Sequence, residues 1–531
     1  MTPTGAILGI IFFAGMLTAS AGAQTFLDKP LADWLKELAS ADAKQRRSAA
    51  FAIGKMGDDA GPAVSKLMRA LRDPDPGVSD AAAFALGEIG APAREAVPLL
   101  TVLLNDRDAD PKVRRSAAYA LGSLKANGGD AVTALARALD DPQPAIRQNA
   151  AWALGRLTLP TPKPIVQALE VKLADGDAVV RRDVAAALGA FGRESRPALP
   201  SMLRRLPEEI DPEVRKALLN TLVNLVGPDD GSAAAPLRAA LGDKDSETAL
   251  LAALALGNIG GNRAAPAVPL LRTALADPTV TVRRQAAGAL TNIGPDAAPA
   301  VADLCRALTD DDPQVQSRSA LALGAIGPAA KAAAPHLIRA LRSRVVEVRL
   351  YAIEALARIE SGLDQAVSEL ARILREDPDV AVRQRAVWAL GRVSDLEGSG
   401  AATALASVLT ETAPDTAIVR YEAARYLAHG LGGKTPDKAI EILTAMLSDT
   451  SIRIYTRTDA KVTSGAESGG STSVAPNIGG DGRTLPAMAL GAVGPKANRP
   501  EVVRALQELA RSREPRLKEA ATDALKRITG K

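Results

Sequence analysis

The chain has 531 residues, of which 47% are hydrophobic and only 3% aromatic, so Ala, Leu, Val and Ile must fill most of its interior. Sixty-five basic and 61 acidic residues leave a formal charge of +4, too small over this length to indicate nucleic acid or an anionic membrane surface as partner. The single cysteine, Cys305, excludes an internal disulfide and a thiolate metal cluster, and its apolar surroundings favour a buried structural thiol.

Residues 1–23 predict a signal peptide and therefore export to the periplasm or the extracellular space. Ala6 to Leu17 form an uncharged apolar run, and Ala21-Gly22-Ala23 has the Ala-x-Ala pattern of a secretory cleavage site. No Lys or Arg precedes the run, which leaves an uncleaved anchor as the alternative. No later segment approaches the roughly 20 apolar residues of a spanning helix, so we expect no membrane span after signal removal.

Residues 24–531 are dominated by a self-similar block of about 34 residues, clearest between Asp141 and Leu157. Repetition at this period predicts a stack of helix pairs, here named A and B, in which each pair buries its apolar face only against its neighbours. We take the small residue that closes the recurring Ala-Leu-Gly as the anchor of each repeat. Fourteen repeats can then be placed, and the expected fold is an all-α solenoid of about 14 helix pairs.

The elements of one repeat follow from local signals around the anchor Thr291. Apolar residues return at helical spacing after Pro269 and predict helix A over 270–275. Asp277-Pro278 ends that helix, and 282–290 is predicted as helix B, closed by Gly294 in a left-handed cap. At the start of the stack, 27–39 is expected to form the first A helix.

Two polar positions recur with the repeat and predict a structural ladder between its layers. An Asp stands fourteen residues before the anchor in many repeats, and an Arg stands eight residues before it. An acidic turn residue beside a basic helix start favours hydrogen bonds that cap helices and fix the register between repeats. The ladder residues are Asp141 and Arg147, Asp175 and Arg181, Asp277 and Arg283, and Asp377 and Arg383.

The turn Asp-Pro-x-x-x-Val-Arg followed by Ala-Ala-x-Ala-Leu-Gly-x-Ile-Gly resembles the HEAT-repeat family, in its bacterial phycobilisome-lyase-like form, over residues 27 to 531. The resemblance implies a right-handed superhelix whose B helices line a concave face that binds other proteins. The iron-dependent hydroxylases of this family hold their metal through several His-Glu pairs. Here the two histidines, His336 and His429, are followed by Leu and Gly. We therefore expect no metal, no cofactor and no catalytic residue.

The third position before the anchor is unusually aromatic and marks the candidate binding surface. Because this position and those seven before and one after the anchor share one face of helix B, the rings lie among Arg and other polar side chains. Aromatic rings flanked by Arg are typical of binding hot spots, although rings also fill gaps between adjacent helices. Exposure of the rings separates the two interpretations. The candidate partner-binding residues are Phe51, Phe84, Tyr119, Trp152, Arg115 and Arg156, with Trp388 and Arg392 in a later repeat.

One insertion, at 449–484, interrupts the thirteenth repeat. It opens with alternating residues over 452–462, which favour a strand, and continues Gly- and Ser-rich, as in a protruding loop or β-hairpin. Three hypotheses follow. The first is an exported, monomeric, non-catalytic scaffold that binds a protein or peptide along the concave face. The second is a phycobilin-lyase-like enzyme or chromophore chaperone. The third is an envelope-assembly module that binds through the 449–484 loop.

Overall fold

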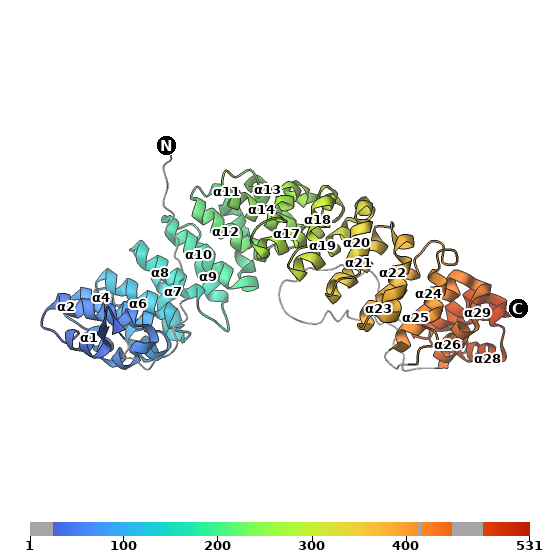
Figure 1. Ribbon diagram of the computed structural model, residues 1–531. Helices are drawn as coiled ribbons and strands as arrows, with labels where there is room; N and C mark the ends of the chain where they lie inside the picture. The colour runs from blue at the N-terminus through green and yellow to red at the C-terminus, as the bar shows by residue number, and fades with distance from the viewer. Residues whose placement is uncertain (1–24, 413–415, 449–481, 531) are drawn as a thin grey trace. The chain divides into compact units, whose positions relative to one another are not determined.

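The computed structural model describes residues 25–412, 416–448 and 482–530. Within these ranges the chain forms antiparallel helix pairs and one very short β-hairpin, so the predicted all-α solenoid is confirmed (Figure 1). The predicted signal peptide, 1–23, and all but the end of the insertion lie outside the described residues. The chain divides into two units, 1–205 with 213–221 and 206–212 with 222–531, and each is described by itself.

Fourteen A/B pairs are present among the described residues, one for each predicted repeat. In the first unit the A helices are α1 (Leu31–Glu37), α3 (Val64–Ala70), α5 (Val97–Asn105), α7 (Gly129–Ala138) and α9 (Lys163–Lys172), and α11 (Leu199–Glu208) belongs to both units. The B helices are α2 (Ala43–Lys55), α4 (Pro76–Ile89), α6 (Pro111–Ser123), α8 (Pro144–Gly155) and α10 (Ala178–Ala190), and α12 (Pro212–Leu225) belongs to both units.

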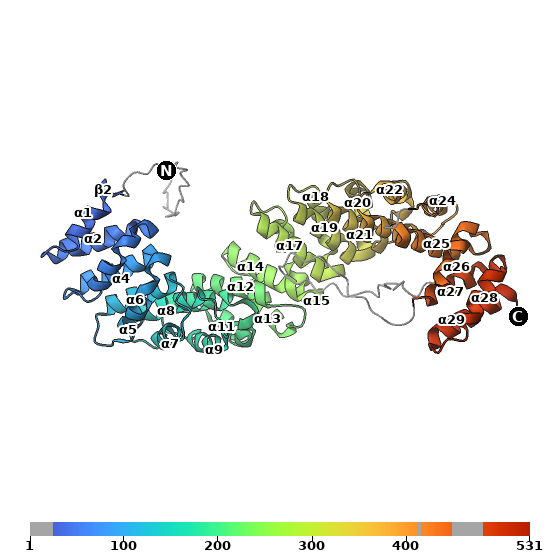
Figure 2. The ribbon, with the colours of Figure 1, turned by 90° about the horizontal axis from the view of Figure 1, so that it is seen from below.

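The second unit continues the same alternation. Its A helices are α13 (Ala234–Ala240), α16 (Val268–Ala274), α18 (Val301–Ala307), α20 (Ala334–Ala340), α22 (Leu363–Glu376), α24 (Ala401–Ser407), α26 (Asp437–Ser448) and α28 (Pro500–Leu509). Its B helices are α14 (Ser246–Ile259), α17 (Val280–Ile293), α19 (Pro313–Ile326), α21 (Val346–Arg358), α23 (Val380–Leu390), α25 (Ala417–Leu431), α27 (Thr484–Val493) and α29 (Pro515–Thr529), and a short α15 (Gly261–Ala264) precedes α16. Figure 2 shows α18, α20, α22 and α24 in one row, beside α19 and α21.

Local signals placed the elements of the repeat around Thr291 to within a few residues. Helix A is α16 and helix B is α17, and Gly294 follows with a positive φ of 70°, which glycine adopts without a Cβ clash. Its ψ of −132° lies outside the left-handed helical region, so the expected left-handed cap is not formed. Helix B is longer than predicted at both ends, because a helix ends at its capping residues and not at the last residue of its apolar pattern.

The N-terminal end differs from the prediction of a helix over 27–39. Thr25–Phe26 (β1) pairs antiparallel with Lys29–Pro30 (β2), and α1 begins only at Leu31. Pro30 explains the late start, because proline disfavours a helical conformation in the residue before it. The hairpin contacts α1 through Trp34, whose indole Nε1 donates to the carbonyl oxygen of Phe26 at 3.3 Å.

One apolar stretch is longer than the sequence analysis expected. Pro313–Ala340 is long and apolar enough to cross a membrane by length and composition, and half of its most apolar window is buried. The stretch is not one straight helix, because it contains α19, a 3₁₀ segment that begins at Gly327 with φ 73°, and α20. Both helices pack against α21, so this stretch is an ordinary part of the stack.

Candidate binding face on the B helices

Four aromatic rings from consecutive B helices form one continuous stack in the first unit. Phe51 of α2 lies against Phe84 of α4, with ring centres 5.8 Å apart and planes inclined by 11°. Phe84 lies 5.5 Å from Tyr119 of α6, and Tyr119 lies 5.2 Å from Trp152 of α8. We call these four residues the ring stack. It joins four repeats through a single line of contacts.

The ring stack is accessible along its whole length. Phe51 is 46% exposed, and the other three rings are partly exposed, so none of them lies in the buried core. The rings therefore fill space between adjacent B helices, as the packing interpretation expects. They also keep an accessible edge, which the binding interpretation requires.

Charged groups surround the ring stack and link its repeats. The Lys55 ammonium forms an ion pair with Glu88 at 2.8 Å and lies 4.8 Å from the centre of the Phe84 ring. Glu88 also accepts a hydrogen bond from the Tyr119 hydroxyl, and burial together with this bond raises the pKa of Tyr119. Arg115 of α6 lies 3.5 Å from Asp80 of α4. The Lys55–Glu88–Tyr119 contact was not foreseen, because its members come from three repeats.

A second aromatic site occurs in the second unit, on α23 and α25. Two guanidinium groups lie over the Trp388 ring, Arg385 at 5.6 Å and Arg392 at 5.3 Å from its centre. Tyr426 of α25 approaches the same helix so closely that a Cβ built at Gly391 would clash with its ring. Sequence reasoning missed Tyr426, which stands two residues before its anchor instead of three.

The anchor glycines bring the B helices, and with them the rings, into contact. A Cβ built on Gly122 of α6 would lie 2.7 Å from the Cα of Ala153 on α8 and 2.8 Å from the Trp152 ring. Real Cβ atoms do not approach backbone atoms this closely, so the glycine is required by the neighbouring repeat. This close approach accounts for the recurring Ala-Leu-Gly.

The ladder arginines connect consecutive repeats. Arg147 donates from Nε and Nη2 to the carboxylate of Asp175 in the next repeat, at 2.8 and 2.7 Å, and from Nη1 to the carbonyl of Asp141 in its own turn at 2.9 Å. The carboxylate partner therefore belongs to the following repeat. The same arrangement joins Arg46 to Asp73, Arg114 to Asp141, Arg283 to Asp310 and Arg349 to Asp377, and Arg383 reaches Glu411 instead of an aspartate.

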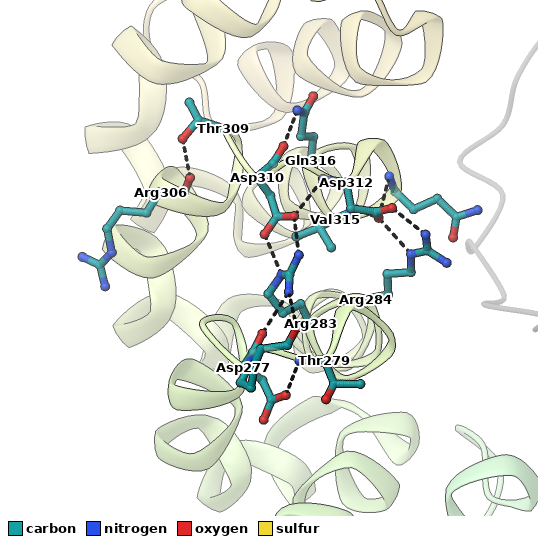
Figure 3. Close-up of polar contacts among 12 residues, drawn as sticks. Asp277, Thr279, Arg283, Arg284, Arg306, Thr309, Asp310, Asp312, Val315 and Gln316 are labelled. Carbon is teal, nitrogen blue, oxygen red and sulfur yellow. Dashed lines mark hydrogen bonds and ion pairs between the residues drawn. The ribbon is translucent and has the colours of Figure 1, made fainter. Parts of the chain in front are cut away.

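Ladder residues also form hydrogen bonds within their own turn. Arg181 donates to the carbonyl oxygen of Asp175 at 2.7 Å, and the Asp277 carboxylate accepts the backbone N–H of Thr279 at 2.7 Å. Where the residue two places after the ladder aspartate is itself an aspartate, it caps helix B, as Asp312 does for α19 by accepting from the Gln314 and Val315 N–H groups. Figure 3 shows this turn, with Arg283 and Arg284 of α17 directed toward it. Gln143 and Thr279 occupy this position without a side-chain cap.

Asp312 should make the stability of the second unit depend on pH. Hydrogen bonds from Arg284, at 2.8 and 2.5 Å, lower the pKa of Asp312 from 3.8 to about 2. Because this pKa is depressed in the folded state, its stabilisation is complete above the unfolded value near 4 and is lost as the pH falls toward about 2. Arg284→Gln should therefore destabilise the protein at about pH 5 and much less at about pH 2.5 in urea unfolding. An equal effect at both pH values would contradict this prediction.

The single cysteine and a histidine line the same hollow. Cys305, which is 7% exposed, and His336 line a hollow of about 340 Å³ between α18 and α20. Burial raises the pKa of the Cys305 thiol, the opposite of the shift that activates a nucleophile. Within the described ranges no three His, Cys, Asp or Glu side chains are grouped to hold a metal ion.

Comparison with known sequences finds one matching family. The sequence matches a family described as HEAT repeats at residues 31–110, 96–170, 268–357 and 334–428, which together include more than half of the chain. No curated protein matches the sequence.

Many solved structures are similar to the chain. A structure in which Kap95p binding induces the switch loops of RanGDP to adopt the GTP-bound conformation has a TM-score of 0.56 at 13% identity, covering 94% of this chain and 75% of that chain. A homology model of the full-length AP-3 complex has a TM-score of 0.46 at 14% identity, covering 91% and 94%. An engineered protein has a TM-score of 0.39 at 25% identity, covering 75% and 98%. At 13% identity, the likeness to Kap95p shows the fold alone.

Proposed function

Because the chain belongs to the HEAT-repeat family, we propose that it is a non-catalytic scaffold that binds a protein or peptide along the B helices of its first four repeats. The observation that carries the proposal is the ring stack, four rings held in contact across α2, α4, α6 and α8 with none of them buried. HEAT-repeat solenoids typically bind proteins, and Kap95p, which is similar in fold, binds RanGDP.

Pre-ordering of the rings supports this proposal. Each ring is held by its neighbours, so a partner that packs on the accessible edges loses little further side-chain entropy on binding. Polar groups beside the rings supply orientation, and aromatic residues ringed by such groups dominate the affinity of many interfaces. Isolated exposed apolar residues need no such explanation, but a line of four in contact does.

The proposal predicts that the ring stack carries most of the affinity for a bound peptide. Peptides would be selected from a random displayed library on the whole chain, and their Kd measured for wild type and for Phe51→Ser combined with Tyr119→Ser. The double variant should bind at least about 30-fold more weakly, since hot-spot residues each contribute about 2 kcal/mol or more.

Val102→Ser provides the matched control, because Val102 is a 65% exposed apolar residue on the A helix α5. Its affinity should equal that of wild type. Unchanged binding by the double variant, or an equal loss in the control, would place the binding surface elsewhere.

We also propose that the protein is exported and that cleavage follows Ala23. The proposal is supported by the uncharged apolar run from Ala6 to Leu17 and by the Ala-x-Ala pattern that follows it. Mass spectrometry of protein expressed with its natural N-terminus should find Gln24 as the first residue in the periplasmic or medium fraction. Recovery of the intact N-terminus from the cytoplasm would refute export, and recovery in the membrane would indicate an uncleaved anchor.

The remaining hypotheses stay predictions with simple tests. Visible absorbance of the purified protein would indicate a retained chromophore and favour the phycobilin-lyase-like hypothesis. Residues 449–481 of the predicted loop lie outside the described residues, and deletion of 449–484 tests whether partner binding depends on them. The expected monomer is checked by light scattering.

A further inference from the structure

Two B helices, one in each unit, carry nearly the same ten residues. Segment 147–156, which ends one residue past α8, and segment 383–392, which ends two residues past α23, agree at eight of ten positions, and both end in Trp-Ala-Leu-Gly-Arg. No other repeat has Trp at the third position before its anchor or combines Trp with a following Arg in this way. Repeats share their core residues for packing reasons, but Trp and Arg at these positions are partly exposed and are not required by the core.

Three residues of each segment lie in a row on the accessible face of helix B. The Gln and the Trp stand four residues apart and share one face of helix B, and the Arg follows four residues later, just past the helix end. The Arg156 guanidinium lies 4.8 Å from the centre of the Trp152 ring, and that of Arg392 lies 5.3 Å from Trp388. We call the two sets the Gln–Trp–Arg rows: Gln148, Trp152 and Arg156, and Gln384, Trp388 and Arg392.

The arginine of each row is exposed and lacks a counter-ion. Neither Arg156 nor Arg392 forms an ion pair with any described residue, although other arginines on the same faces do. Arg385, for example, lies 2.8 Å from Glu354, and Arg115 is paired with Asp80. Gln148 and Gln384 are partly exposed, and their side-chain amides make no hydrogen bond within the part of the chain that the structure describes. Each row therefore presents a cation without a counter-ion, an aromatic edge and an amide without a hydrogen-bond partner among the described residues.

From this arrangement we propose that each Gln–Trp–Arg row binds an acidic peptide segment that carries an apolar side chain. A Glu or Asp carboxylate of the segment accepts hydrogen bonds from the guanidinium, and the ring already in contact with that guanidinium restricts its motion. The apolar side chain packs on the accessible edge of the tryptophan, and the glutamine amide pairs with the peptide backbone. The inference rests on the proposed function and names the chemistry of its partner.

Single-stranded nucleic acid fits the rows less well. Base stacking needs a free ring face, whereas Trp152 is stacked on Tyr119 and contacted by Arg156, and Trp388 has two guanidinium groups over it. Each row also offers one unpaired cation, whereas binding of nucleic acid depends on neutralising several phosphates.

Tryptophan fluorescence can test the two rows separately. The chain has three tryptophans, and Trp34 is only 9% exposed, so it contributes a nearly constant background. Trp388→Phe leaves Trp152 as the reporter of the first row, and Trp152→Phe leaves Trp388 as the reporter of the second. The probe is a synthetic peptide of about 12 residues with repeating Glu, Leu and Pro, and its partner probe has Gln in place of Glu.

Both reporters should show a saturable change of emission with the Glu peptide. Arg156→Gln should weaken binding at least about tenfold at the first row only, and Arg392→Gln at the second row only, because each removes one charge-assisted hydrogen bond. The Gln peptide should bind at least about tenfold more weakly to both rows.

Arg94→Gln and Arg339→Gln are the controls, since both residues are exposed and neither belongs to a row. Binding that survives the row variants, or equal binding of the Gln peptide, would overturn acidic recognition while leaving apolar binding at the ring stack intact. If the Glu peptide changed the emission of neither reporter, acidic recognition would also be overturned. Library peptides whose binding still depends on Phe51 and Tyr119 would then show that the proposed function holds. A larger change of emission with a single-stranded oligonucleotide of equal charge would indicate that the rows bind nucleic acid and not an acidic peptide.

Discussion

Asp377→Ala should lower the free energy of unfolding of the second unit by about 3 kcal/mol, which makes it one of the most damaging single changes in the ladder. Asp377 accepts two hydrogen bonds from Arg349, at 2.7 and 2.9 Å, and their side chains are only 4% and 9% exposed. Removal of the carboxylate leaves the Arg349 guanidinium buried between two repeats without its counter-ion, and that uncompensated charge is the main cost. Urea unfolding followed by circular dichroism measures the change.

Replacing both Arg349 and Asp377 distinguishes two effects on the free energy of unfolding: the destabilisation caused by one unpaired buried charge, and the stabilisation contributed by the intact ion pair. Arg349→Met with Asp377→Leu should recover more than half of the lost stability, because an apolar pair of similar size needs no counter-ion. Lys438→Ala is the matched control, since Lys438 and Glu441 form an exposed ion pair, and it should cost less than about 0.5 kcal/mol. A double variant as unstable as Asp377→Ala would show that the ladder contributes through its geometry and not through its charges.

Gly122→Val should destabilise the first unit by about 3 kcal/mol and Gly122→Ala by about 1 to 2 kcal/mol, although both replace glycine within a helix. Helix propensity alone favours alanine by about 1 kcal/mol at such a position. The clash outweighs it, because the new Cβ would meet the Ala153 backbone at 2.7 Å and α6 could accommodate it only by moving away from α8. Hydrogen exchange should show the loss of protection first in α6 and α8.

Gly288→Ala is the control for this prediction, because it should raise the stability that Gly122→Ala lowers. Gly288 also lies inside a B helix, α17, but the atom nearest to a Cβ at this position would be the end of the Arg318 side chain, at 3.5 Å. The substitution should stabilise the protein by about 0.5 to 1 kcal/mol. If Gly122→Ala stabilised to the same extent, close packing of the B helices would not be the reason for the anchor glycine.

Sequence reasoning located the repeats because the signals of a helix are local. The hydrogen bonds of a helix join residues four apart, so the apolar spacing around Thr291 and the stop at Asp277 were enough to find α16 and α17. The same reasoning placed the aromatic residues on one helical face. It failed at 27–30, where the effect of Pro30 on its neighbour outweighed the apolar pattern.

The contacts between repeats were decided only by the tertiary structure. That Arg147 reaches Asp175 in the next repeat, and that Tyr119 meets Glu88, depends on the spacing and rotation of neighbouring pairs, which no local pattern specifies. The same holds for the exposure of Phe51 and of the other rings, because a side chain on the accessible face is buried or free according to how closely the next B helix approaches. The amino-acid order by itself determined which residues are helical and which face they share, through interactions within one turn. Stacking of one pair on the next decided which side chains meet and which stay open to a partner.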